Sequence, residues 1–146
     1  MRNDITNSID WNTHLDDISV FQVLHAAVLL ILARLALIVL GFQKTAMIVN
    51  RFSRAGDPRI SMDHAQVQAS KHAVSLAAAF IPARILCLEQ SLVLYYKLKC
   101  NRVPVALRLG VRAYPFAAHA WVELEGRPVN ETPAFLKEFE PILEIG

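Results

Sequence analysis

Residues 116–131 read FAAHAWVELEGRPVNE, and this stretch decides the fold class. Its β-branched and aromatic residues predict a strand, a tight turn at Glu125-Gly126 and a second strand. Antiparallel hairpins of this kind belong to sheets that are covered on one face by other elements. His119 lies in the first strand between two alanines, and such small neighbours leave an imidazole approachable.

The turn determines what His119 faces across the hairpin. If Gly126 takes the left-handed position of a three-residue loop, His119 falls directly opposite Glu131. Opposed Cβ atoms lie about 4.5–5.5 Å apart, so the carboxylate would reach the far ring nitrogen and fix the tautomer. A two-residue loop would instead pair Glu131 with Ala120 and break this arrangement.

Upstream of the hairpin the chain is mostly helical. Helix-like periodicity and breakers predict an α+β fold, with N-terminal helices followed by a core in which a central cysteine-bearing helix packs on an antiparallel sheet. We expect helices over 63–79 and 84–99, a strand over 103–113, and a short helix with a tail over 135–146. The polar segment 50–61 divides the chain into an N-terminal helical region, 1–55, and a core, 56–146.

Residues 18–43 are the most apolar part of the chain, interrupted by Arg34. Ser19 or Asp17 could cap a helix here and Gly41 could end one. Two interpretations stay open, a buried or interface helix and a membrane-surface or membrane-spanning anchor. The charge of Arg34 within this stretch makes membrane insertion less favourable, since a central arginine costs about 2.5–3.5 kcal/mol.

Composition narrows the function classes. The 146 residues carry a net charge of +2 with no basic cluster, which argues against nucleic-acid binding. Cys87 and Cys100 are too far apart along one helix for a disulfide, so we expect free thiols in a reducing cytoplasm. His64 and His72 could share a helix face, but they have no third ligand, and we predict no metal site and no cofactor.

Cys87 is the candidate nucleophile. It is expected about one turn into the helix after Pro82, where the partial positive charge of the helix N-terminus favours a thiolate. Free N–H groups in that first turn could also stabilise an oxyanion. An isolated cysteine among leucines is, however, more often a small core residue.

Four motifs connect the cysteine to the hairpin, and together they resemble the leader peptidases of lasso-peptide biosynthesis, in the bacterial transglutaminase-like superfamily. The motifs are CLEQSL at 87–92, LGV at 109–111, PFAAHAWVE at 115–123 and EGRPVN at 125–130. The resemblance implies a transglutaminase/papain-like core and a cysteine peptidase whose triad is Cys87, His119 and an acid. That acid is usually Asp, whereas position 131 is Glu131, and Asn130 is a substitute candidate.

The resemblance also implies supporting residues and partners. Trp121 would wall the cleft or simply fill the core, while Glu89 and Ser91 follow the nucleophile in a supporting role. The expected substrate is the leader of a precursor peptide, presented by a separate recognition protein because 146 residues leave no room for a recognition domain. An ATP-using macrolactam synthetase would then close the freed core peptide. The alternatives are a protease or amide transferase with another substrate, and a non-enzymatic membrane-associated scaffold.

Overall fold

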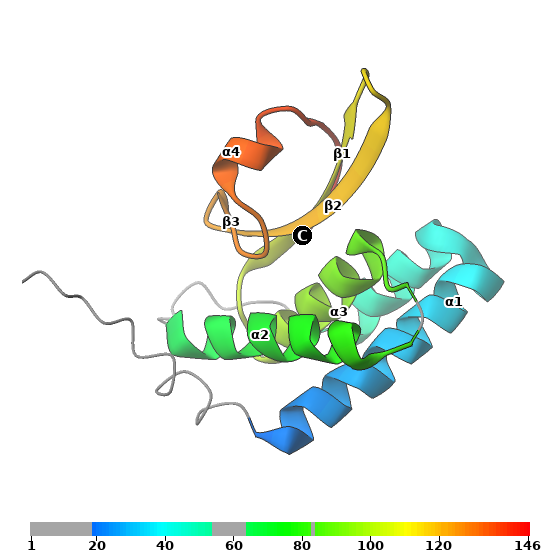
Figure 1. Ribbon diagram of the computed structural model, residues 1–146, viewed down its shortest axis with the longest axis vertical. Helices are drawn as coiled ribbons and strands as arrows, with labels where there is room; N and C mark the ends of the chain where they lie inside the picture. Colours follow the sequence, from blue (N-terminus) through cyan, green and yellow to red (C-terminus); the bar gives the residue numbers. More distant parts are fainter. Residues whose placement is uncertain (1–18, 54–63, 83) are drawn as a thin grey trace, which may run out of the picture.

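A computed structural model describes residues 19–53, 64–82 and 84–146. Three long helices form one layer, and a four-stranded antiparallel sheet with a short helix lies against it (Figure 1). The α+β architecture predicted from the sequence is therefore confirmed. The proposed division at 55/56 falls outside the described residues and stays a prediction.

Helix α1 (Val20–Phe52) begins where expected, because the Ser19 hydroxyl accepts a 3.3 Å hydrogen bond from the N–H of Gln22. At Gly41 the backbone leaves helical geometry, with φ +77° and ψ 171°, and the helix bends into two arms. Since only glycine adopts such a conformation readily, Gly41 marks a corner rather than the end of the helix. The segment expected to be a loop from residue 50 is still helical up to Phe52.

One face of α1 holds the helical layer together. Ala26 and Leu30 are fully buried in the common core, and α1 packs against both α2 (His64–Phe80) and α3 (Cys87–Cys100). The second arm is tied to α3 by Tyr95, whose hydroxyl donates to Asn50 Oδ1 at 3.1 Å. Burial raises the pKa of the Tyr95 phenol above its usual value, which keeps it a neutral donor.

The rest of α1 is unusually apolar for a solvent-facing surface. Of the large apolar side chains that are exposed in the described part of the chain, thirteen belong to α1: Val20, Phe21, Leu24, Val28, Ile31, Leu32, Leu35, Ile38, Val39, Leu40, Met47, Ile48 and Phe52. By length and composition α1 could cross a membrane, and 11% of its most apolar stretch is buried. The helix is thus anchored to the domain on one side and unpaired on the other.

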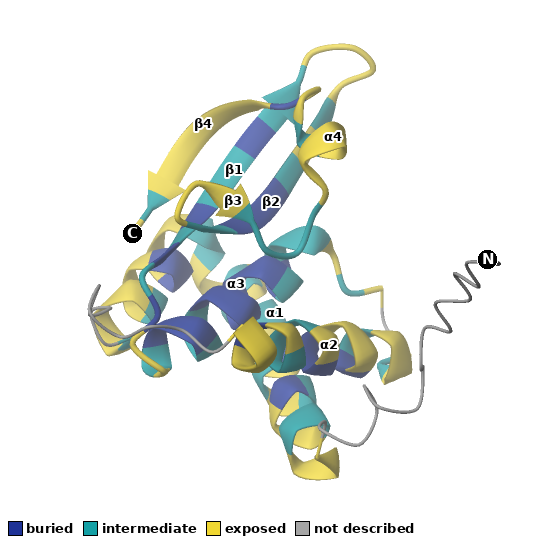
Figure 2. Cartoon of the chain, turned by 90° about the vertical axis from the view of Figure 1, so that its left-hand side faces the viewer, coloured by how far each residue is buried: buried dark blue, intermediate teal, exposed yellow. Residues whose placement is uncertain are grey.

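The sheet has the strand order β3-β2-β1-β4. Strand β1 (Val105–Arg112) pairs antiparallel with β2 (Ala117–Leu124), and on its other side with β4 (Glu140–Ile145). β4 is the outer strand and is exposed almost throughout (Figure 2). The prediction of a tail over this segment is wrong. The segment is a strand whose exposed side chains lack the alternation of buried and exposed residues that indicates a strand.

The turn after β2 also differs from the prediction. Leu124 pairs with Arg127, the first residue of β3 (Arg127–Pro128), so the loop has two residues and not three. Both loop residues, Glu125 and Gly126, have positive φ, at 51° and 74°, as a type I′ turn requires. The three-residue register that was to place His119 opposite Glu131 is therefore wrong.

Candidate active site

Cys87 is the first residue of α3, not one turn inside it as the sequence suggested. The helix begins here because the Glu89 carboxylate accepts a hydrogen bond from the N–H of Leu86, which forms one half of a capping box. Gln90 N–H closes the first turn onto the Leu86 carbonyl at 3.2 Å. The thiol thus lies at the positive end of the helix dipole, where backbone N–H groups are without intrahelical partners.

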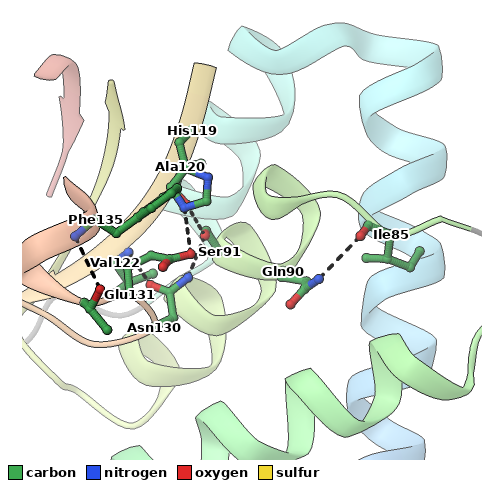
Figure 3. Close-up of polar contacts among 10 residues, drawn as sticks. Ile85, Gln90, Ser91, His119, Ala120, Val122, Asn130, Glu131 and Phe135 are labelled. Atoms are coloured by element: carbon green, nitrogen blue, oxygen red, sulfur yellow. Dashed lines mark hydrogen bonds and ion pairs between the residues drawn. The ribbon is translucent and has the colours of Figure 1, made fainter. Parts of the chain in front are cut away.

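His119 and Glu131 are in direct contact despite the altered register. His119 Nε2 lies 2.8 Å from Glu131 Oε1, and the two side chains meet beside β2 (Figure 3). Past the pair Glu123↔Pro128, the Val129 N–H still donates to the Val122 carbonyl at 2.8 Å, but the Asn130 side chain takes the Val122 N–H, so regular pairing stops there and the chain curls over residues 129–131. This curl brings Glu131 to the imidazole, although the two residues are not ladder partners.

Asn130 is engaged elsewhere and does not contact His119. Its Oδ1 accepts from the Val122 N–H at 2.8 Å, and its Nδ2 donates to Ser91 Oγ at 2.9 Å. Ser91 in turn donates to the carbonyl oxygen of Ala120 at 2.8 Å and is fully buried. We call Ser91, Asn130 and their two β2 partners the polar clamp, because they join the nucleophile helix to the histidine strand.

A small polar cavity of about 150 Å³ borders the nucleophile. Cys87 and Glu131 lie on its wall together with Lys71, Val74, Ser75, Gln90, Leu94 and Asn130. Within residues 19–53, 64–82 and 84–146 the Cys87 sulfur has no hydrogen-bond partner, and this includes His119. The thiol and the His119–Glu131 pair therefore meet at one cavity through Glu131, with the sulfur and the imidazole still apart.

A larger apolar cavity of about 210 Å³ lies in the corner between the two arms of α1 and α3. Its walls are aliphatic apart from Thr45 and Tyr96. No His, Cys, Asp or Glu lines this cavity, and the Thr45 hydroxyl donates to the Gly41 carbonyl at 2.8 Å, so the smaller polar cavity is the candidate active site.

Aromatic side chains fix the orientation of the imidazole. Trp121 stacks on His119 with ring centroids 6.4 Å apart, and Phe135 of α4 (Pro133–Leu136) meets it edge-on at 5.2 Å. Phe139 lies 5.6 Å from the same ring. The sequence pointed to Trp121 but missed both phenylalanines, because only the fold of α4 brings them to the histidine.

Trp121 has a fixed place of its own. It is 2% exposed, and its indole N–H donates to Glu123 Oε1 at 2.8 Å. The ring lies over Gly110, where an added Cβ would come within 2.8 Å of Trp121. Gly110 is also the strand partner of His119, so the glycine of the LGV motif leaves room for the ring that supports the imidazole.

The chain is similar in sequence to known proteins. The family model described as "Transglutaminase-like superfamily" matches residues 28–144. The chain is 36% identical over 59 residues to the Microcin J25-processing protein McjB of Escherichia coli. That match covers 40% of this chain and 28% of the relative, and no solved structure matches. These findings confirm the resemblance that the sequence motifs indicated.

Proposed function

Because the chain belongs to the transglutaminase-like superfamily, we propose that it is a cysteine peptidase that removes the leader from a lasso-peptide precursor. In this proposal Cys87 is the nucleophile, His119 the general base and Glu131 the residue that orients the histidine. The observation that supports it most is the 2.8 Å contact between His119 and Glu131 beside the cavity that Glu131 shares with Cys87. The similarity to a protein that processes microcin J25 suggests the substrate class.

The contact with Glu131 assigns different tasks to the two nitrogens of His119. A carboxylate next to Nε2 holds the proton there, so Nδ1 carries the free lone pair. Nδ1 can then take the proton of the Cys87 thiol, and Glu131 stabilises the imidazolium that forms. Of the two candidates for the third member, the contact with His119 supports Glu131, since both ends of the Asn130 amide are bonded within the polar clamp.

The reaction then proceeds by acyl transfer. The Cys87 thiolate attacks the carbonyl carbon at the leader–core junction, and the resulting oxyanion is stabilised by the free N–H groups at the start of α3. His119 returns its proton to the amine of the core peptide, which leaves as the C–N bond breaks. Water, deprotonated by His119, hydrolyses the thioester and releases the leader carboxylate.

Among the described residues no hydrogen bond joins the Cys87 sulfur to the imidazole, so the proposed proton transfer requires these two groups to come into contact. Catalytic hydrogen bonds are often long without substrate and shorten when the substrate binds. A peptide bound in the cavity lined by Lys71, Ser75 and Gln90 would exclude water from the thiol and bring it closer to Nδ1. The supporting roles follow from the contacts, since Glu89 caps α3, Ser91 anchors it and Trp121 supports the imidazole.

The partners follow from the chemistry of the products. We infer that a separate recognition protein presents the leader, and that an ATP-using macrolactam synthetase consumes the freed amine of the core peptide. Free thiols at both cysteines are compatible with a cytoplasmic location.

We also infer contact with a membrane surface through α1. No acidic residue occurs in this helix, whereas Lys44 and Arg51 lie on its second arm beside exposed Met47 and Ile48. An apolar surface bordered only by positive charge fits the interface of an anionic bilayer. Because α1 stays packed on the domain through Ala26 and Leu30, it would lie along the surface and not span the bilayer.

The direct test combines the purified protein, the recognition protein and a precursor peptide, with leader release followed by mass spectrometry. We expect release by the wild type and none by Cys87→Ala. A leader fragment released at wild-type rate by Cys87→Ala would refute the mechanism. An added primary amine separates the alternatives, because an amide transferase would join it to the leader, whereas a peptidase in water gives the free carboxylate.

A further inference from the structure

Arg34 makes the one charged interruption of the apolar first arm of α1, and the structure shows what it contacts. Its Nη1 donates to the carbonyl oxygen of Arg84 at 2.7 Å and lies 3.3 Å from Glu89 Oε1. The Glu89 side chain is only 8% exposed, whereas that of Arg34 is 37% exposed. A residue 55 positions away in sequence is thus held at the start of the nucleophile helix.

Glu89 presents an electrostatic problem for a nucleophile at this position. Its carboxylate caps α3 by bonding the N–H of Leu86, directly before Cys87. A negative charge stabilises a helix N-terminus, but it also opposes formation of a second negative charge on a neighbouring thiol. Without a counter-charge, the same group that starts the helix would weaken the field that favours the thiolate.

Arg34 provides that counter-charge and also restrains the backbone. Its guanidinium lies against the second oxygen of the Glu89 carboxylate, while Oε2 serves as the cap. Its bond to Arg84 fixes the segment that leads into Cys87. Both contacts come from one guanidinium nitrogen of Arg34.

We propose that Arg34 is a positioning residue for Cys87. It neutralises the charge of Glu89, so that the positive electrostatic potential at the N-terminus of α3 stabilises the Cys87 thiolate undiminished. This inference deepens the proposed function and rests on it, because it assigns a second, charge-based device to the same nucleophile. Among the residues that the structure describes, Arg34 is not part of the cavity lining, and its polar contacts are with Arg84 and Glu89. It links α1, the helix with the exposed apolar face, to the reacting group.

Thiol alkylation tests this without any peptide substrate. The full chain is treated with iodoacetamide from about pH 5.5 to 9, and the rates at Cys87 and Cys100 are followed separately by peptide mapping. In Arg34→Gln we expect the Cys87 rate at neutral pH to fall about 3–10-fold, as one uncompensated charge in a dielectric close to that of water implies. The pH of half-maximal rate should rise, while the Cys100 rate stays unchanged.

Three further variants separate charge from structure. Arg34→Lys keeps the charge and should recover most of the Cys87 rate. Glu89→Gln keeps a cap acceptor without the charge, and Arg34→Gln combined with Glu89→Gln should restore the rate lost in Arg34→Gln. The control is Arg127→Gln, an exposed arginine on β3, which should leave the Cys87 rate as it is.

The outcomes also distinguish this inference from the proposed function. If Cys87 is alkylated no faster than Cys100 in the wild type, the activated nucleophile itself is refuted. If Cys87 is fast in the wild type and equally fast in Arg34→Gln, only the role of Arg34 is refuted. Loss of rate in both Arg34→Gln and the double variant would likewise overturn the charge argument, since it would reflect backbone disorder alone. In the leader-release assay, Arg34→Gln should lower kcat with little change in KM.

Discussion

The imidazole of His119 is held on several sides, with Glu131 at Nε2, Trp121 stacked on its face, and two phenylalanines at its edge. Its side chain is 13% exposed, so the ring can adopt few orientations. If Nε2 carries the proton that Glu131 accepts, Nδ1 is left unprotonated, which is the state that the proposed deprotonation of Cys87 needs.

Replacing Glu131 by Gln should separate charge from contact. The amide can still accept a hydrogen bond from Nε2–H, but it cannot stabilise the imidazolium. We expect kcat for leader release to fall about 10²–10⁴-fold, the range typical of acid–base groups, with KM nearly unchanged. Glu131→Asp, which keeps the charge on a shorter side chain, should retain more activity than Glu131→Gln. Equal activity in Glu131→Gln and the wild type would remove Glu131 from the mechanism.

The hydroxyl of Ser91 both donates and accepts within the polar clamp. Ser91 and Ala120 are buried and Asn130 is half-buried, and Ser91→Ala removes the partner of the Asn130 amide nitrogen and of the Ala120 carbonyl. We expect the free energy of unfolding in denaturant to fall by about 1–3 kcal/mol. Ser75→Ala, at an exposed position on the wall of the same cavity, is the matched control and should leave stability unchanged.

At the residue scale, the sequence predicted which residues belong to the candidate site better than it predicted how they are arranged. Cys87, His119 and Glu131 were selected from motifs and spacing, and the structure places Glu131 against His119. The reason given for that contact was wrong, because the identity of a Glu-Gly loop does not reveal whether two or three residues form the turn. The contact arises from the curl after Pro128, a path that strand pairing rules do not describe.

The bend in α1 is a feature of a whole element that depends on one residue. Gly41 has φ +77°, and nothing lies within 4 Å of where a Cβ would be, so backbone strain alone excludes other residues. We expect Gly41→Ala to lower the free energy of unfolding by about 1–3 kcal/mol, as measured by denaturant titration. A variant as stable as the wild type would mean that the two arms can realign into one straight helix.

Helices and strands were predicted correctly where a single hydrophobic pattern dominated the segment. The helices α2 and α3 and the strands β1 and β2 follow periodicity and breakers, and they were found within a few residues. The C-terminal strand β4 was missed because a strand at a sheet edge needs no buried face, and so its sequence shows no alternation. Its pairing with β1 depends on the tertiary fold.

The exposed apolar face of α1 affects how the whole molecule contacts its surroundings. The protein should bind vesicles of phosphatidylglycerol and bind phosphatidylcholine vesicles more weakly, as measured by co-sedimentation. Lys44→Glu combined with Arg51→Glu should weaken binding, since each basic residue near an anionic surface contributes about 1 kcal/mol.

A second pair of variants tests the apolar part of this surface. Val39→Asp, at a position 76% exposed, should reduce vesicle binding, whereas Phe116→Asp, 78% exposed on the loop between β1 and β2, should not. If the wild type ignores both vesicle types, the membrane contact is refuted. If it forms dimers that Val39→Asp abolishes, the face is an interface between copies. The sequence left these choices open because exposure depends on how α1 packs, which hydropathy does not report.

The polar clamp has a consequence for how the two layers recognise each other. Apolar packing between α3 and the sheet is non-directional, so on its own it would tolerate several relative placements of the layers at similar free energy. The hydrogen bonds of Ser91 and Asn130 accept only one of them. A doubly apolar replacement could therefore keep much of the thermal stability and still lose the unique native state. The polar clamp would then fix the position of α3 relative to β2. The distance between nucleophile and base would therefore have a single value instead of a distribution of values.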